Sequence, residues 1–183
     1  MASRAPDYTP LLVESLLDQI IAILQRDFLA NLQQVNPAAN YTAGINAYHK
    51  AEQELYNNPP EALVEPIESP FAPDEQMALA AEHVFAVSVF VTQGNTSELL
   101  AQTSRDYARA LVWTLGRRQD YSDYMNPLPI VHSDGTVGQT AGMSAGQVKA
   151  VTLRHVGWAI KGTMNDQLAR LPMVEVGIQT EEL

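Results

Sequence analysis

The sequence predicts one α/β domain of the α+β type over residues 1–183, with a small mixed or antiparallel sheet flanked by two amphipathic helices. Two segments space their apolar residues by three and four positions, as helices do, and three others alternate, as strands do. The 183 residues, 46% of them apolar, are enough to bury a core without crosslinks. The chain contains no cysteine, which excludes disulfides and thiolate metal sites.

The first helix is predicted over residues 11–32. Its apolar stripe consists of Leu12, Val13, Leu16, Leu17, Ile20, Ile21, Leu24, Phe28 and Leu32. Thr9 is a suitable cap, and Pro10 suits the first helical position, where a missing N–H costs nothing. Asn36 and Pro37 are expected to end the helix.

The segment 38–72 is interrupted by prolines, so we expect one strand between Tyr41 and Leu55 and then an irregular connection. Residues 74–81 are predicted to form two helical turns. The clearest strand is His83–Thr92, whose two faces are both mostly apolar. This pattern is typical of a central strand that helices cover on at least one side.

A second amphipathic helix is predicted over 98–115, with Asn95 three residues before Glu98 as in a capping box. Gly116 is expected to end this helix because glycine tolerates the backbone conformation that follows a helix.

The segment 121–147 is predicted to be a projecting arm or loop. It is rich in glycine and proline, and Asp134-Gly135 is a signal for a tight hairpin. Residues 148–160 are again predicted to form a strand. Its alternation of apolar residues shifts by one position near Arg154 or His155, as one extra residue in a β-bulge would require. A last strand with one solvent-exposed face is predicted over 174–178.

The chain carries 21 acidic and 11 basic side chains, a formal net charge of −10. Proteins that grip nucleic acid use clustered cations to neutralise phosphates, so this balance argues against that class. The longest apolar stretch lies within 84–91 and is too short to span a membrane. Residues 1–7 lead into no apolar signal core, so we expect no export signal.

One catalytic pattern occurs: Gly142-Met143-Ser144-Ala145-Gly146 matches the G-x-S-x-G nucleophile elbow. In that elbow a strand delivers the serine to a tight turn and a helix follows. Here a strand is predicted to follow, and His155 precedes Asp166, the reverse of the order in that fold. We therefore interpret the motif as a flexible loop, predict no catalytic residue and expect no enzyme activity.

The four histidines are far apart in the sequence and show no metal-ligand spacing. His132 together with Asp123 and Asp134 could hold an oxygen-preferring cation, but a solvated turn is the favoured interpretation. No glycine-rich phosphate loop is present. We predict no metal ligand, no cofactor-binding residue and no cofactor.

Four arginines lie on or just after the second helix: Arg105, Arg109, Arg117 and Arg118. They form either a patch for an acidic partner or, as we favour, a solvated face paired with Asp106 and Asp120. Trp113 and Trp158 are expected to fill the core, because aromatic rings bury a large area. Glu181-Glu182 is expected to be a solvated tail.

The order of elements resembles that of the tail terminator, or tail completion, proteins of tailed bacteriophages. The likeness extends over most of the chain, through the helices 11–32 and 98–115 and the strands 83–91, 148–160 and 173–178. It implies a homo-oligomeric ring, usually a hexamer, that caps the finished tail tube, stops its polymerisation and joins it to the neck. The implied partners are further copies of the chain, the tube, a sheath where present, and neck or connector proteins. The implied location is the virion tail or neck, after assembly in the host cytoplasm, with no membrane contact.

Six copies would carry a net charge of −60. A channel lined by carboxylates repels phosphate, so DNA would pass through the ring without specific binding. Ring assembly needs head-to-tail contacts, to which the arm 126–147 is expected to contribute. Two alternatives stay open: another neck component such as a connector or head-closure protein, and a small-molecule enzyme or binding domain with a pocket at the strand ends.

Overall fold

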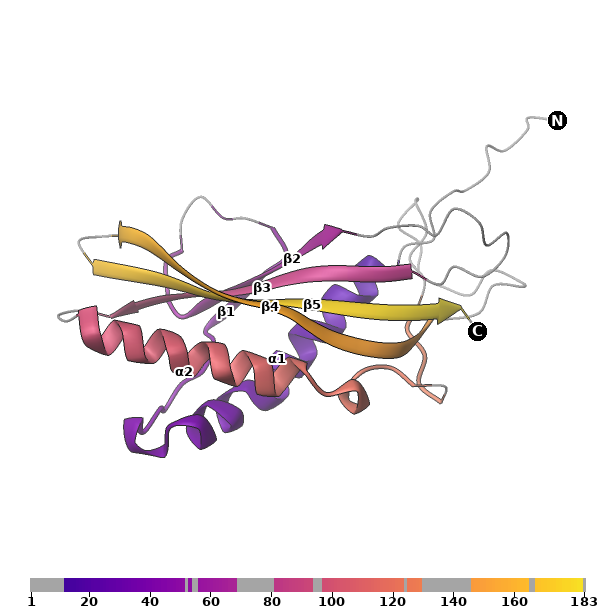
Figure 1. Ribbon diagram of the computed structural model, residues 1–183, viewed down its shortest axis with the longest axis horizontal. Helices are drawn as coiled ribbons and strands as arrows, with labels where there is room; N and C mark the ends of the chain where they lie inside the picture. Colours follow the sequence, from indigo (N-terminus) through magenta and orange to yellow (C-terminus); the bar gives the residue numbers. More distant parts are fainter. Residues whose placement is uncertain are drawn as a thin grey trace, which may run out of the picture.

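The computed structural model describes residues 12–51, 53, 56–68, 81–93, 97–123, 125–129, 146–164 and 167–182. In chain order the elements are α1 (Val13–Val35), η1 (Pro37–Ala39), β1 (Ala47–His49), β2 (Glu61–Glu68), β3 (Ala81–Gln93), α2 (Ser97–Leu115), η2 (Arg118–Asp120), β4 (Gly146–Met164) and β5 (Gln167–Glu182). The sheet has the order β1-β2-β3-β5-β4, in which β1 and β2 are parallel and all other pairs antiparallel. The prediction of an α+β domain with a mixed sheet and two helices is confirmed (Figure 1).

Helix α1 buries the stripe that its spacing predicts, from Val13 to Leu32. It ends where expected, since the N–H of Asn36 still bonds the carbonyl of Leu32 and Pro37 then starts the short η1. Asn40 follows in the left-handed conformation with a φ of 51°, which turns the chain toward β1. The helix begins at Val13 with Leu12 at the N-cap position and no side-chain cap hydrogen bond, so the expectations of Thr9 as the cap and Pro10 as the first helical residue are wrong. Thr9 and Pro10 themselves lie outside the described residues.

Strand β3 is the central strand, as predicted, with β2 on one side and β5 on the other. Its alternate residues Phe85, Val87, Val89 and Val91 are buried in the core that the helices cover. Helix α2 packs over β3, β5 and β4, whereas α1 packs against α2 and β2. The helix expected at 74–81 falls on residues outside the described part, apart from Ala81, which begins β3.

Strand β2 was not expected, because Pro66 argues against a strand. The structure accommodates this proline in two ways that strands allow. Strand β1 pairs with β2 only at residues 61–63, so Pro66 lies where β2 forms the edge of the sheet. A β-bulge also interrupts the pairing with β3 between Pro66 and Glu68. The expectation of an irregular connection is therefore wrong for 61–68, while the expected strand between 41 and 55 is the short β1.

Strands β4 and β5 form a long antiparallel pair. The extra residue predicted near Arg154 or His155 is confirmed, since the register shifts between Leu153 and His155. Two further shifts, between Val148 and Ala150 and between Ile160 and Gly162, were not expected. Strand β5 includes Glu181, so the expectation of a tail is wrong there; its carboxylate lies 2.5 Å from the ammonium of Lys149 and stays about half exposed to solvent, as expected.

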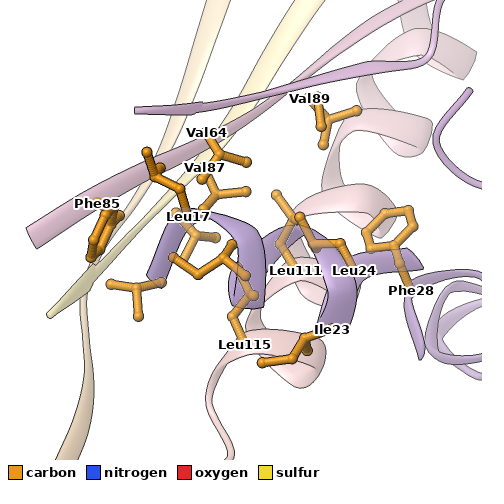
Figure 2. Close-up of a cluster of buried hydrophobic side chains, with 14 of the residues drawn as sticks. Leu17, Ile23, Leu24, Phe28, Val64, Phe85, Val87, Val89, Leu111 and Leu115 are labelled. Carbon is orange, nitrogen blue, oxygen red and sulfur yellow. The ribbon is translucent and has the colours of Figure 1, made fainter. Parts of the chain in front are cut away.

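One continuous buried cluster joins both helices to β2, β3, β4 and β5. Figure 2 shows its centre, where Leu24 and Phe28 of α1 and Leu111 of α2 lie beneath Val64 and Val87 of the sheet. Burying such side chains supplies about 1.5–3 kcal/mol each, which makes this cluster the main support of the fold.

The described ends of the segment 121–147 lie against the body of the protein. Tyr121 and Leu128 are buried, and Leu128 forms a two-bonded antiparallel bridge with Gly146, at N–O distances of 2.8 and 2.9 Å. The hairpin predicted around Asp134-Gly135 lies outside the described residues, and its projection stays a prediction.

Candidate assembly surfaces

The residues of the G-x-S-x-G pattern show no nucleophile elbow within the described part. Gly146 is the first residue of β4, so a strand and not a helix follows the motif. His155 lies exposed in the middle of that strand. Ser144 and Asp166 lie outside the described residues, and so do His132 and Asp134 of the possible cation group.

Asp123, the third member of that group, caps a turn: its carboxylate accepts the backbone N–H groups of Met125 and Asn126, at 3.0 and 2.9 Å. In the part of the chain that the structure describes, no three His, Asp or Glu side chains gather as metal ligands. The structure of the Asp123 segment therefore agrees with the favoured interpretation, a turn.

A His–Glu pair, which the sequence analysis missed, links the half-buried His49 of β1 to the buried Glu61 of β2. The Nε2 of His49 lies 2.6 Å from the carboxylate of Glu61, which is 3% exposed. The other oxygen of Glu61 accepts the backbone N–H of Asn58. The ring of His49 meets Tyr56 edge-on, and Tyr56 stacks on Phe90 of β3. Since both carboxylate oxygens are bonded, the pair is best explained as a structural link.

A second buried carboxylate, Asp106 of α2, holds the two helices together. It is 4% exposed and accepts hydrogen bonds from the amide of Asn36, at 2.7 Å, and from the hydroxyl of Tyr41, at 2.9 Å. Burial, followed by the hydrogen bond to Asp106, raises the pKa of Tyr41 to about 12. The expectation that Asp106 pairs with an arginine is therefore wrong.

Asp120, in contrast, pairs with Arg117 as expected, at 2.8 Å. Arg26 of α1 joins the same group, at 3.0 Å from Asp120 and 2.6 Å from Asp27. The hydrogen bond from Arg26 is the main reason why the pKa of Asp27 is lowered, and Arg117 adds to the effect. This charge cluster ties the end of α2 to the middle of α1.

The outer face of α2 carries a stripe of exposed side chains, which we call the α2 outer face: Leu99, Gln102, Arg105, Arg109 and Trp113. Trp113 is 49% exposed, so the expectation that it fills the core is wrong. Its position follows from the helix period, since it lies four residues after Arg109, on the face turned from the sheet. Arg105 and Arg109 form no ion pair with any residue that the structure describes, which leaves them available to an acidic partner.

The outer edge of β4 carries a second exposed tryptophan. Trp158 is 53% exposed and Val156 is 36% exposed, so the core prediction fails for Trp158 as well. Val151 and Leu153, earlier in β4, do pack against the core, and Leu153 lies beside Gly116 at the end of α2. Beyond Leu153, helix α2 no longer covers β4. In Figure 1 the later half of β4 and helix α2 lie on opposite sides of β5.

The opposite side of the sheet has an open edge of its own. Beyond residue 63, β2 has no described neighbour on its outer side, because β1 pairs only with residues 61–63. Ile67 is 53% exposed at the bulge, between Glu65 and the exposed Glu68. The two edges therefore both combine apolar side chains with charge.

Neither α1 nor the described part of α2 is both long and apolar enough to cross a membrane.

Comparison with known proteins shows where this fold recurs. No protein family model matches the chain, and no curated protein matches it by sequence. A solved chain from the virion of a native gene transfer agent particle is similar at a TM-score of 0.50 and 14% identity, covering 94% of this chain and 99% of that one. A second solved structure, with 16% identity over 88% of this chain and 94% of its own, reaches a TM-score of only 0.34. The chain is thus similar in fold, over nearly its whole length, to a component of a gene transfer agent virion.

Proposed function

We propose that this chain is a structural protein of a phage-type virion and that it forms the tail terminator ring. The observation that carries the proposal is the likeness in fold to a chain of a gene transfer agent virion, which extends over nearly all of both chains. The order of elements, which resembles that of phage tail terminators, supports the same assignment independently.

The surface of the molecule favours assembly over catalysis. Trp113 on α2 and Trp158 on β4 are each about half exposed, and tryptophan is enriched at protein interfaces. Both buried carboxylates, Glu61 and Asp106, accept hydrogen bonds from their own chain and hold elements together.

Net charge supports a ring around a DNA path. Each copy contributes −10, so a ring of six carries −60 and presents little net attraction to phosphates. We expect such a ring to let a duplex pass without holding it. The partners in this proposal are further copies of the chain, the tail tube, a sheath where present, and the neck.

Deletion of the gene from its producing genome tests the role, with particles examined by electron microscopy. A tail terminator predicts tails of uncontrolled length. Tails of normal length that fail to join heads would point instead to another neck protein, and normal particles with a lost reaction would point to an enzyme. Micrographs of the purified chain, in which rings are expected, provide the direct check.

A further inference from the structure

Charge is distributed unevenly across the sheet. Residues 1–96 carry twelve acidic and three basic side chains, a net charge of −9, whereas residues 97–183 carry nine acidic and eight basic, a net charge of −1. Within the sheet, β1, β2 and β3 contain four acidic residues and no basic one, whereas β5 and β4 contain three acidic and four basic residues. Since the strand order is β1-β2-β3-β5-β4, the sheet has an acidic side and a side with little net charge.

The two edge strands show this polarity most sharply. Strand β4 contains three basic residues, Lys149, Arg154 and Lys161, and no acidic one. Strand β2 contains no basic residue, and Glu65 and Glu68 lie in its open part, whereas Glu61 is buried beside His49. Lys149 and Arg154 have carboxylate partners in their own sheet, Glu181 and Glu82, yet both cations stay more than one third exposed.

Bulges limit where the β4 edge can pair. The register shifts at Leu153/His155 and at Ile160/Gly162 leave a regular stretch at residues 155–160, which contains Val156 and Trp158. The open part of β2, residues 64–68, is of similar length and contains Ile67. The β4 stretch has no bulge and carries exposed apolar side chains, so it is the kind of edge that contacts another chain. The β2 stretch contains Pro66 and a bulge, so it offers exposed side chains and not a continuous row of backbone hydrogen-bond partners.

We propose that the ring is closed by the β4 edge of one copy, at residues 155–160, docking on the β2 edge of the next copy, at residues 64–68. The inference rests on the proposed function, since it assumes that the chain forms a ring. Trp158 and Val156 supply apolar area against Ile67, and the opposite charges of the two edges set the orientation.

The charges also decide the symmetry of the contact. Two β2 edges repel each other through Glu65 and Glu68, whereas β4 has no acidic residue that could attract a second β4 edge, so a symmetric dimer through either edge is disfavoured. The contact β4 to β2 joins different surfaces, and a heterologous contact of this kind generates closed rings when its rotation closes.

Two double variants with complementary charges test the contact. The first, Val156→Glu with Trp158→Glu, places carboxylates opposite the glutamates of the next copy. The second, Glu65→Lys with Glu68→Lys, makes both edges basic. All four positions are at least partly exposed, and none forms an ion pair that the structure records, so each variant is expected to fold. Circular dichroism checks that expectation.

Each double variant alone is expected to need at least about tenfold more protein than wild type to assemble, as judged by light scattering and native mass measurement. An equal mixture is expected to regain wild-type assembly, because alternating copies restore opposite charges at every contact. A ring of six has an even number of positions and accommodates the alternation. Recovery in the mixture also shows that both variants are folded.

Gln25→Glu with Gln34→Glu, which adds two carboxylates at exposed positions of α1, is the matched control and is expected to assemble as wild type does. If either double variant assembles alone like wild type, or if the mixture stays unassembled, the edge contact is refuted. Wild-type rings in the same experiment would leave the proposed function intact. Wild-type protein that stays monomeric, even with purified tail tube protein added, would instead refute the ring on which the inference rests.

Discussion

Asp106→Ala removes the acceptor that joins α2 to the chain after α1. The carboxylate is 4% exposed and receives the amide of Asn36 and the hydroxyl of Tyr41 on one oxygen. Its partners lie 70 and 65 residues away along the chain, so the loss affects tertiary packing and not the local helix.

The magnitude follows from the two hydrogen bonds. A hydrogen bond to a charged group contributes about 1.5–3 kcal/mol, so removal of both is expected to lower the free energy of unfolding by about 3–5 kcal/mol. Domains of ordinary size are stable by only about 5–15 kcal/mol, so the variant should lose a large fraction of its stability. Tyr41→Phe removes one of the two donors and is expected to cost about 1–2 kcal/mol.

Urea unfolding of wild type, Asp106→Ala, Tyr41→Phe and the double variant forms a double-mutant cycle. We expect the double variant to lose less stability than the sum of the single losses, by about 1 kcal/mol or more. Gln102→Ala, an exposed change on the same helix, is the control and should stay within about 0.5 kcal/mol of wild type. A loss below about 1 kcal/mol for Asp106→Ala, or strict additivity with Tyr41→Phe, would refute this account of the helix contact.

Three further predictions concern packing, pH and exposure. A Cβ on Gly146 would meet Leu12 Cδ1 at 2.5 Å, so Gly146→Ala should cost about 1–3 kcal/mol in urea unfolding, with a less than additive loss when combined with Leu12→Ala. Burial raises the pKa of Tyr107 and Tyr121 above the ordinary 10.0, so the folded chain keeps these protons to higher pH than the unfolded chain does. The contribution of these two protons to the free energy of unfolding is complete below pH 10 and declines above it. Tyr107→Phe or Tyr121→Phe should therefore reduce the loss of stability between about pH 10 and pH 12. An unchanged slope of stability against pH would contradict the raised pKa values. Trp113→Ala should change the free energy of unfolding by less than about 1 kcal/mol, whereas a core tryptophan would cost about 3–5 kcal/mol.

The elements that the sequence predicted well are those in which a local pattern is sufficient. The apolar stripe of α1 repeats over six turns, and β3 alternates without interruption between two neighbours. The bulge near Arg154 was predictable because an extra residue shifts the apolar phase within the strand itself. In each case the information lies within a few residues of the feature.

Strand β2 escaped prediction because its Pro66 is acceptable only at an open edge with a bulge. Whether a strand has a neighbour there depends on where β1 ends, and no pattern within 61–68 contains that information. The His49–Glu61 link was missed for the same reason, since it requires the parallel pairing of β1 with β2.

The amino-acid sequence by itself determined the two helices, the central strand and the acidic balance of the chain, because periodicity and charge belong to the residues alone. Tertiary structure decided that Trp158 is exposed and that Asp106 bonds Asn36 and Tyr41, whereas the outward position of Trp113 already follows from the helix period. The physical reason is that burial depends on what covers a side chain. Helix α2 covers β4 only as far as Leu153. Because the sheet twists, the rest of the β4 edge is open to a partner.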